Sequence, residues 1–133
     1  MEHEIQRWFE YADADLGVAK HLLETYHPKP LEIICYHCQQ AAEKAIKAMI
    51  LAFDLPGGIP KKHDLTFLLN QLRGCVTIDS ALRRHADMLN SYSIMVRYPA
   101  EILIDENTTA NSIQYAEEIV NWAKRIVVER MPI

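Results

Sequence analysis

The residues of this sequence that could perform metal or redox chemistry are Cys35 and Cys38, with His37 between them. Thiolates and an imidazole can ligate zinc, and a Cys-x-x-Cys pair can form a thiol–disulfide couple. A structural zinc site needs four ligands, and the sequence holds only one further cysteine, Cys75, far along the chain. A thioredoxin-like motif would adjoin a strand, and no strand is predicted there. We therefore expect no metal, no cofactor and no redox activity at these positions.

Both cysteines instead fit the buried face of a helix that is predicted to run from Pro30 to about Asp54. Because an α-helix turns by about 100° per residue, side chains of one face recur every three or four positions. Cys35 and Cys38 fall in the middle of an apolar arc, where a cysteine packs as a small hydrophobic side chain. The other residues of this arc are Ile34, Ala42, Ala45, Met49 and Ala52.

A polar stripe lies almost opposite this arc on the same predicted helix. Its residues follow the spacing i, i+3, i+7 and i+10, and they are His37, Gln40, Lys44 and Lys47. One interpretation is a solvated face, in which Glu43 pairs with Lys47 one turn later. The other is a surface that contacts an anion or a protein partner through two cations, an amide and an imidazole. The spacing leaves both interpretations open.

The loop before a third predicted helix carries three basic side chains, Lys61, Lys62 and His63. Asp64 follows them and is suited to cap that helix. Backbone N–H groups at a helix start can bind phosphate, and the lysines would add positive charge. Because Asp64 would repel a nearby anion, the alternative is an ordinary cap beside solvated lysines.

A second loop, with the sequence VRYP, contains Arg97 and Tyr98 before Pro99. An arginine can bind phosphate or carboxylate through two parallel hydrogen bonds, and a tyrosine ring can stack on a nucleobase. The structural alternative is that Arg97 pairs with a carboxylate of another helix while Pro99 fixes the chain direction. If Arg97 converges with Lys44 and Lys47, the three cations form a modest anion site.

The spacing of apolar residues predicts helices along most of the chain and no convincing strand. Proline, glycine and capping residues divide this pattern into three long and two short helices. The long helices cover 3–26 and 30–54, and the last begins at Thr108 or Thr109. The short helices cover 66–72, ending near Gly74, and 81–92, capped by Asp79 or Ser80. The predicted fold is all-α, an antiparallel up-and-down helical bundle of four to five helices.

The length and composition of the chain limit the number of domains and the classes of protein to which it can belong. With 133 residues, the chain is expected to form a single domain, residues 1–133. Its formal charge of −4 argues against general attraction to nucleic acid but permits a local basic patch. The sequence has three cysteines, which do not suit a disulfide framework, and no apolar run approaches the roughly 20 residues of a membrane helix. We expect a cytoplasmic protein with no membrane association.

Three segments of the sequence resemble the HEPN domain family: HCQQAAEKAIKAMI at 37–50, PKKHDLTFLLNQL at 60–72 and VRYP at 96–99. Members share a pattern like H-x-Q-Q-A-x-E-K-x-x-K, then a T/K-H-D-L turn, then R-Y-P before a final helix. The first helix is similar as well, through Trp8, Ala12, Asp15, Leu16 and Ala19. The resemblance covers nearly the whole chain, with the motifs in the family's order.

The resemblance implies an up-and-down bundle that is often a homodimer and is linked with nucleotide or nucleic-acid binding. Many members are encoded beside, or fused to, a minimal nucleotidyltransferase, and some are metal-independent ribonucleases that act as toxins paired with that partner. The ribonuclease members carry an arginine that is followed, after four to six residues, by a histidine. No arginine of this sequence has a histidine at that spacing, so we assign no catalytic residue.

We therefore expect a HEPN-domain protein that binds a nucleotide or nucleic acid and acts with a separate minimal nucleotidyltransferase, as in a toxin–antitoxin pair. The expected ligand-binding residues are His37, Gln40, Lys44, Lys47, His63, Arg97 and Tyr98. One alternative is a metal-independent ribonuclease with a non-standard site, in which His37 or His63 lies beside Arg97. The other is a purely structural dimerisation module, in which the stripe with the two glutamines packs against a second copy.

Overall fold

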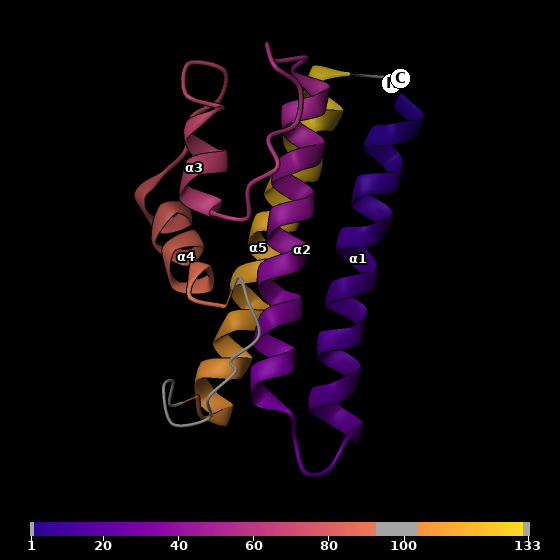
Figure 1. Ribbon diagram of the computed structural model, residues 1–133, viewed down its shortest axis with the longest axis vertical. Coiled ribbons are helices and arrows are strands. Elements are labelled where there is room, and N and C mark those ends of the chain that lie inside the picture. The colour runs from indigo at the N-terminus through magenta and orange to yellow at the C-terminus, as the bar shows by residue number, and fades with distance from the viewer. Residues whose placement is uncertain (1, 93–103, 132–133) are drawn as a thin grey trace.

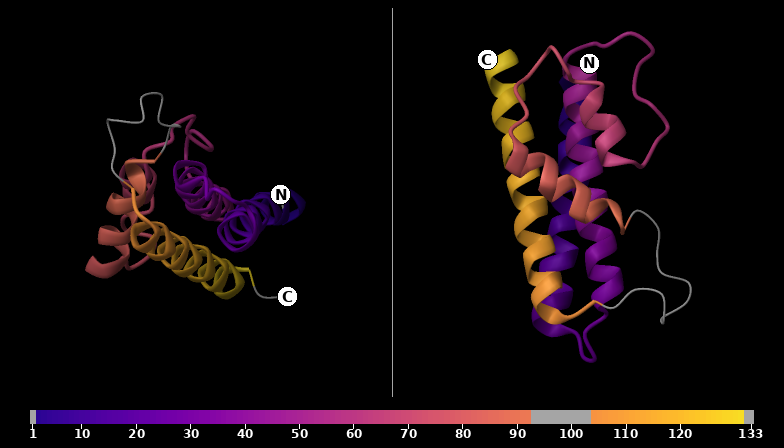
Figure 2. Two further views of the ribbon diagram at one scale, coloured as in Figure 1. Left: turned by 90° about the horizontal axis from the view of Figure 1, so that it is seen from below. Right: turned by 90° about the vertical axis from the view of Figure 1, so that its left-hand side faces the viewer.

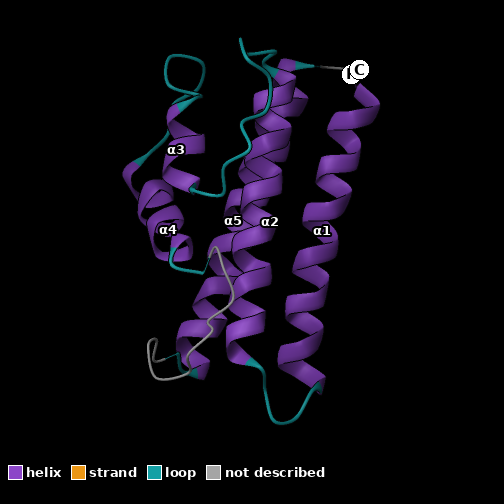
Figure 3. Cartoon of the chain, in the orientation of Figure 1, coloured by secondary structure: helices purple, strands orange, loops and turns teal. Residues whose placement is uncertain are grey.

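The computed structural model describes residues 2–92 and 104–131, and this part of the chain is built from helices (Figure 3). It contains five helices and one isolated bridge between Arg73 and Val76, with no strand in the described ranges. The helices are α1 (Glu2–Thr25), α2 (Leu31–Ala52), α3 (Leu65–Asn70), α4 (Ser80–Asn90) and α5 (Glu106–Arg130). None of these helices is long and apolar enough to cross a membrane. The all-α prediction is confirmed.

The three long helices lie side by side, and the two short helices cover one side of them (Figure 1). In the view of Figure 1, α1 descends, α2 ascends, α4 runs back down and α5 ascends again, which confirms the up-and-down bundle. Figure 2 shows α4 crossing α5 obliquely. Exposed ion pairs join α1 to α5 at two levels, Lys20 with Glu117 and Lys124 with Asp13.

Helix α2 is the centre of the bundle, because it alone among these helices packs against all four of the others. Its apolar arc is buried as predicted except at Ala52, which is half-buried, and Cys38, Ala42 and Ala45 are fully inaccessible. Burial also reaches one residue of the polar stripe, Lys47, and two polar residues beside the stripe, Gln39 and Glu43. The interpretation of the stripe as a solvated face is therefore wrong for Lys47, which is 8% exposed, whereas His37 and Lys44 keep about a quarter of their side chains exposed.

The start of α5 differs from the prediction by two to three residues. The helix begins at Glu106 rather than at Thr108 or Thr109, and Asp105 is its N-cap. The Asp105 carboxylate accepts the backbone N–H of Thr108 at 2.7 Å, which places Thr108 inside the first turn. Aspartate is the better cap because its carboxylate carries a full negative charge at the positive end of the helix.

Asp64 caps α3 as predicted and also ties α3 to α4. Its Oδ1 atom accepts the backbone N–H groups of Thr66 at 2.9 Å and Phe67 at 3.2 Å. The same oxygen accepts a hydrogen bond from the Asn90 side chain at 2.8 Å, and Asn90 in turn accepts the N–H of Leu65 at 2.8 Å. The bond from Asn90, together with the two backbone bonds, lowers the pKa of the Asp64 carboxyl group.

Replacing Asp64 with alanine is expected to lower the free energy of unfolding at neutral pH by about 1 kcal/mol, the usual contribution of an N-cap. Because the folded-state pKa of Asp64 is depressed, this contribution is present above the unfolded-state pKa and is lost as the pH falls through the folded-state value. Denaturant titrations at a series of pH values should therefore show that the difference in free energy of unfolding between the variant and the parent protein shrinks in acid. Asp64→Asn is the matched control, since asparagine caps without titrating. A constant difference between Asp64→Ala and the parent down to low pH would contradict this account.

Candidate functional site

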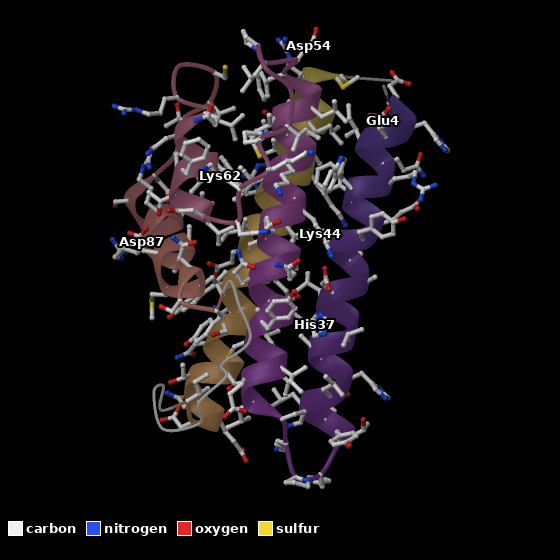
Figure 4. All side chains as sticks on the ribbon, viewed as in Figure 1. Glu4, His37, Lys44, Asp54, Lys62 and Asp87 are labelled. Atoms are coloured by element: carbon white, nitrogen blue, oxygen red, sulfur yellow. The ribbon has the colours of Figure 1, made fainter. Side chains whose placement is uncertain are left out.

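Asp15, a buried carboxylate on α1, gathers two residues of the polar stripe. Its Oδ1 atom lies 2.8 Å from His37 Nδ1, and its Oδ2 atom forms an ion pair with Lys44 Nζ. His37 and Lys44 are seven residues apart, so they lie on one face of α2 and reach the same partner. Figure 4 shows them above one another on α2, directed towards α1. We name these three residues the Asp15 cluster.

The Asp15 cluster holds a cation and an imidazole at the surface. An ionised carboxylate only accepts hydrogen bonds, so His37 uses its Nδ1–H to donate to Asp15 and directs Nε2 away from it. The Lys44 ammonium has three N–H donors and uses one of them on Asp15. About a quarter of each side chain remains exposed, 25% for His37 and 26% for Lys44. Both therefore keep groups with which to contact a ligand.

Glu43, a second buried carboxylate, binds the next two basic residues. Its Oε2 atom lies 3.0 Å from Lys47 Nζ, which confirms the predicted pair one helical turn apart. Its Oε1 atom lies 3.1 Å from Nδ1 of His63, in the loop before α3. The Glu43 and Lys47 side chains are 5% and 8% exposed, whereas that of His63 is 66% exposed. Lys47 also lies 6.0 Å from the centre of the Trp8 ring on α1.

The two neighbouring glutamines complete this second group. Gln39 is fully buried and donates to the His63 carbonyl at 2.8 Å and to Glu43 Oε1 at 3.3 Å. Gln40 donates to the Gln39 side-chain oxygen at 2.8 Å. These bonds fix the loop before α3 against α2 and orient the carboxylate. We name Gln39, Gln40, Glu43, Lys47 and His63 the Glu43 cluster.

Five of the seven predicted ligand-binding residues lie in these two clusters, namely His37, Gln40, Lys44, Lys47 and His63. Arg97 and Tyr98 lie outside the described residues. The prediction did not include Asp15 or Gln39. Asp15 carried a usable signal, because an acidic residue in the buried stripe between Ala12 and Leu16 must find a cationic partner.

The charges of the two clusters are balanced internally. Lys44 is paired with Asp15 and Lys47 with Glu43, so with neutral imidazoles the two clusters together carry no net charge. The stripe is therefore not a row of free cations. Its capacity to bind an anion comes from the Lys44 N–H groups that Asp15 leaves unused and, when the imidazoles are protonated, from the Nε2–H groups of His37 and His63. At the start of α3, the N–H groups of Thr66 and Phe67 are already bonded to Asp64.

The cysteines pack as the sequence predicts. Cys35 and Cys38 are buried, and the Cys35 thiol lies 3.6 Å from the Thr109 hydroxyl. Burial raises the pKa of both thiols, and for Cys38 the neighbouring Cys35 adds to the effect. Within residues 2–92 and 104–131, no three His, Cys, Asp or Glu side chains gather as metal ligands.

A thiol-labelling experiment should distinguish the three cysteines. Because only the thiolate reacts, and Cys75 is the exposed one, we expect the native protein to react quickly with one equivalent of a disulfide reagent. Cys35 and Cys38 should react only after denaturation. In a Cys75→Ser variant, fast labelling should be absent, and fast labelling that persisted there would contradict the buried, protonated state of the other two thiols.

Comparisons with known proteins show which family and which solved structures this chain is similar to. The model of the HEPN domain matches residues 5–126 of this chain. The structure is similar to that of TT1696 from Thermus thermophilus, with 25% identity, a TM-score of 0.78, and coverage of 92% of this chain and 97% of that one. It is also similar to an HEPN domain protein from Thermotoga maritima, with 27% identity, a TM-score of 0.55 and 93% coverage of both chains.

A third solved structure, the archaeal HEPN homologue ST0689, shares the fold at 21% identity, with a TM-score of 0.71 and coverage of 92% of this chain and 97% of that one. No curated protein matched the sequence.

Proposed function

The chain belongs to the HEPN domain family, and from this premise we propose that it binds the phosphate of a nucleotide or RNA at the Asp15 and Glu43 clusters. The observation that carries the proposal is the way in which buried carboxylates hold Lys44, His37 and His63 at the surface. A cationic side chain that is already oriented loses less conformational entropy when a ligand binds. Preorganisation therefore compensates for the absence of a large positive charge.

Phosphate binding at this site would use donors that are free in the unliganded protein. The two remaining N–H groups of Lys44 can each donate to a phosphate oxygen in a charge-assisted hydrogen bond. His37 and His63 can donate from Nε2 when they are protonated. Asp15 competes with the phosphate for the Lys44 ammonium, and its negative charge repels the incoming anion. We therefore expect modest affinity for phosphate.

Of the remaining predicted residues, two support the site from behind, and two are proposed to contact the ligand directly. Lys47 is too buried to reach a phosphate and acts through its charge and through its position against Trp8. Gln40 orients the Glu43 cluster through Gln39. Arg97 and Tyr98 remain proposed ligand residues, with a guanidinium suited to phosphate and a ring suited to a base.

The proposal also includes protein partners, a separately encoded minimal nucleotidyltransferase in a toxin–antitoxin-like pair and a second copy of this chain. Family membership supports both. An apolar hollow of about 350 Å³ between the start of α1 and the end of α5 offers a surface for such a contact, lined by Ile5, Phe9, Val127, Val128 and Met131 among others. Co-expression with a minimal nucleotidyltransferase, followed by light scattering, tests both partners. A monomer that does not co-elute would contradict this part of the proposal.

A second candidate function is RNA cleavage without a metal, and His63 is the observation that favours it. Its imidazole is largely exposed and is held at Nδ1 by a buried carboxylate, which is the arrangement of a general acid–base histidine. Cleavage of RNA in EDTA that disappears in His63→Ala would support this function. No cleavage by the purified chain would leave phosphate binding as the proposed function.

Thermal melting against nucleotides and short RNA tests phosphate binding. A ligand at 100 times its Kd adds about 2.7 kcal/mol of stability, which raises the Tm of a domain of this size by several degrees. We expect this shift in the parent protein and its loss in Lys44→Ala. Lys20→Ala, which removes a lysine from an exposed ion pair with Glu117, is the matched control and should keep the shift. A shift that survives Lys44→Ala would place the anion elsewhere.

A further inference from the structure

A small hollow on α1 has the composition of a stacking site. It has a volume of about 150 Å³ and is lined by Glu4, Arg7, Trp8 and Tyr11. The Tyr11 residue is 50% exposed and Trp8 is half-buried. Arg7 donates from Nη2 to the Tyr11 hydroxyl at 2.6 Å, and its guanidinium carbon lies 5.6 Å from the centre of the Tyr11 ring. Two aromatic rings and a cation are thus held together on one exposed face of the helix.

This hollow adjoins the Glu43 cluster. Trp8 forms one of its walls and also lies 6.0 Å from the Lys47 ammonium, which is bound to Glu43. The hollow therefore has a cation on each side, Arg7 towards solvent and Lys47 towards α2. In the described part of the chain, Arg7 has no carboxylate within ion-pairing distance, so its charge is available to a ligand.

We propose that this hollow takes the base of a mononucleotide whose phosphate is bound at the Asp15 and Glu43 clusters, an inference that rests on the proposed function. A volume of about 150 Å³ is below the roughly 300 Å³ of the smallest complete ligand pockets, so it suits one planar group rather than a whole nucleotide. Aromatic faces stack on any nucleobase, and flanking cations add cation–π attraction. Glu4 accepts hydrogen bonds from ring or amino N–H groups, which favours guanine, the base that carries both a ring N–H and an amino group.

The charge of the protein favours a mononucleotide over a long nucleic acid. The formal charge of −4 repels a polyanion, whereas a single phosphate needs only the local donors. A protein partner could also cover exposed aromatic rings, since tyrosine, tryptophan and arginine are frequent at protein interfaces. The two cations beside the hollow, Arg7 and Lys47, favour the nucleotide.

The fluorescence of Trp8 provides a direct test. The chain has two tryptophans, so Trp122→Phe leaves Trp8 as the sole reporter. Titration of this variant with guanosine, adenosine, cytidine and uridine monophosphates should quench Trp8, because a stacked base contacts the indole ring. Ribose 5-phosphate and inorganic phosphate should bind at the clusters without quenching. We expect Tyr11→Ala to weaken binding of the monophosphates by about 5- to 150-fold, the usual contribution of one stacked base.

Tyr26→Ala is the matched control, because Tyr26 is 56% exposed just beyond the end of α1 and is far from the hollow in sequence. It should leave nucleotide affinity unchanged. If nucleotides bind without quenching Trp8 and the Tyr11→Ala variant binds them normally, the proposal that the hollow stacks a base is wrong. The proposed binding of phosphate at the two clusters would be unaffected by this result. If neither nucleotides nor ribose 5-phosphate bind, the proposed function and this inference both fail. If Tyr11→Ala instead changes the oligomeric state seen by light scattering, the hollow is a protein contact and the inference is overturned.

Discussion

Replacing Glu43 with alanine is expected to lower the free energy of unfolding by about 3 to 5 kcal/mol, the usual cost of removing one member of a buried ion pair. The reason is the position of Lys47, whose side chain is 8% exposed and which would keep a charge with no partner. The same substitution removes the acceptor of the His63 and Gln39 hydrogen bonds. Denaturant unfolding followed by circular dichroism measures the change. Since small domains are stable by about 5 to 15 kcal/mol, the variant should be close to unfolding at moderate temperature.

Two further variants test this explanation. Lys47→Met in the Glu43→Ala background removes the unpaired charge and should recover most of the lost stability, because a buried pair can be replaced by apolar side chains at little cost. Glu117→Ala removes a carboxylate from the exposed pair with Lys20 and should cost less than about 1 kcal/mol. If Glu43→Ala and Glu117→Ala lowered the free energy of unfolding by similarly small amounts, the buried Glu43–Lys47 pair would not be what stabilises this part of the bundle.

Replacing Asp15 with asparagine is expected to strengthen phosphate binding by about 10- to 100-fold. A unit charge roughly 6 Å from a bound phosphate, in an effective dielectric constant of about 20, changes the binding free energy by about 3 kcal/mol, which is an upper bound. Asparagine keeps an oxygen to accept the hydrogen bond of His37 or Lys44 but carries no charge. Calorimetric titration with inorganic phosphate measures the effect, at a temperature where the variant is fully folded. The gain should be smaller at high salt, because Lys44 is partly exposed.

The corresponding control is the double variant Asp15→Asn, Lys44→Ala, in which phosphate affinity should return to about the parent value, because one negative and one positive charge beside the phosphate are removed together. Asp13→Asn removes a second α1 carboxylate that pairs with Lys124 instead, and it should leave phosphate affinity nearly unchanged. Weaker phosphate binding in Asp15→Asn would mean that Asp15 acts mainly by aiming Lys44.

Several features of the molecule follow from local sequence and were predicted from it. Asp64 caps α3 as predicted, and Asp79, one of the two caps predicted for α4, caps that helix, because aspartate satisfies the free N–H groups of a first turn. The burial of Cys35 and Cys38 follows from their place in an apolar arc. The Glu43–Lys47 pair follows from its spacing of four residues. In each case the interacting groups are separated by less than two helical turns, so helix geometry alone sets their positions.

What only the tertiary structure decided is which surface of α2 meets which partner. Asp15 precedes His37 by 22 residues and Lys44 by 29, and Glu43 meets His63 across 20 residues. No helical period relates these positions, because their contacts depend on how α1 and the loop before α3 pack against α2. The sequence determined a helix with a polar stripe. Packing determined that buried carboxylates divide this stripe into two neutral clusters, because a buried cation must be paired before the helices can close over it.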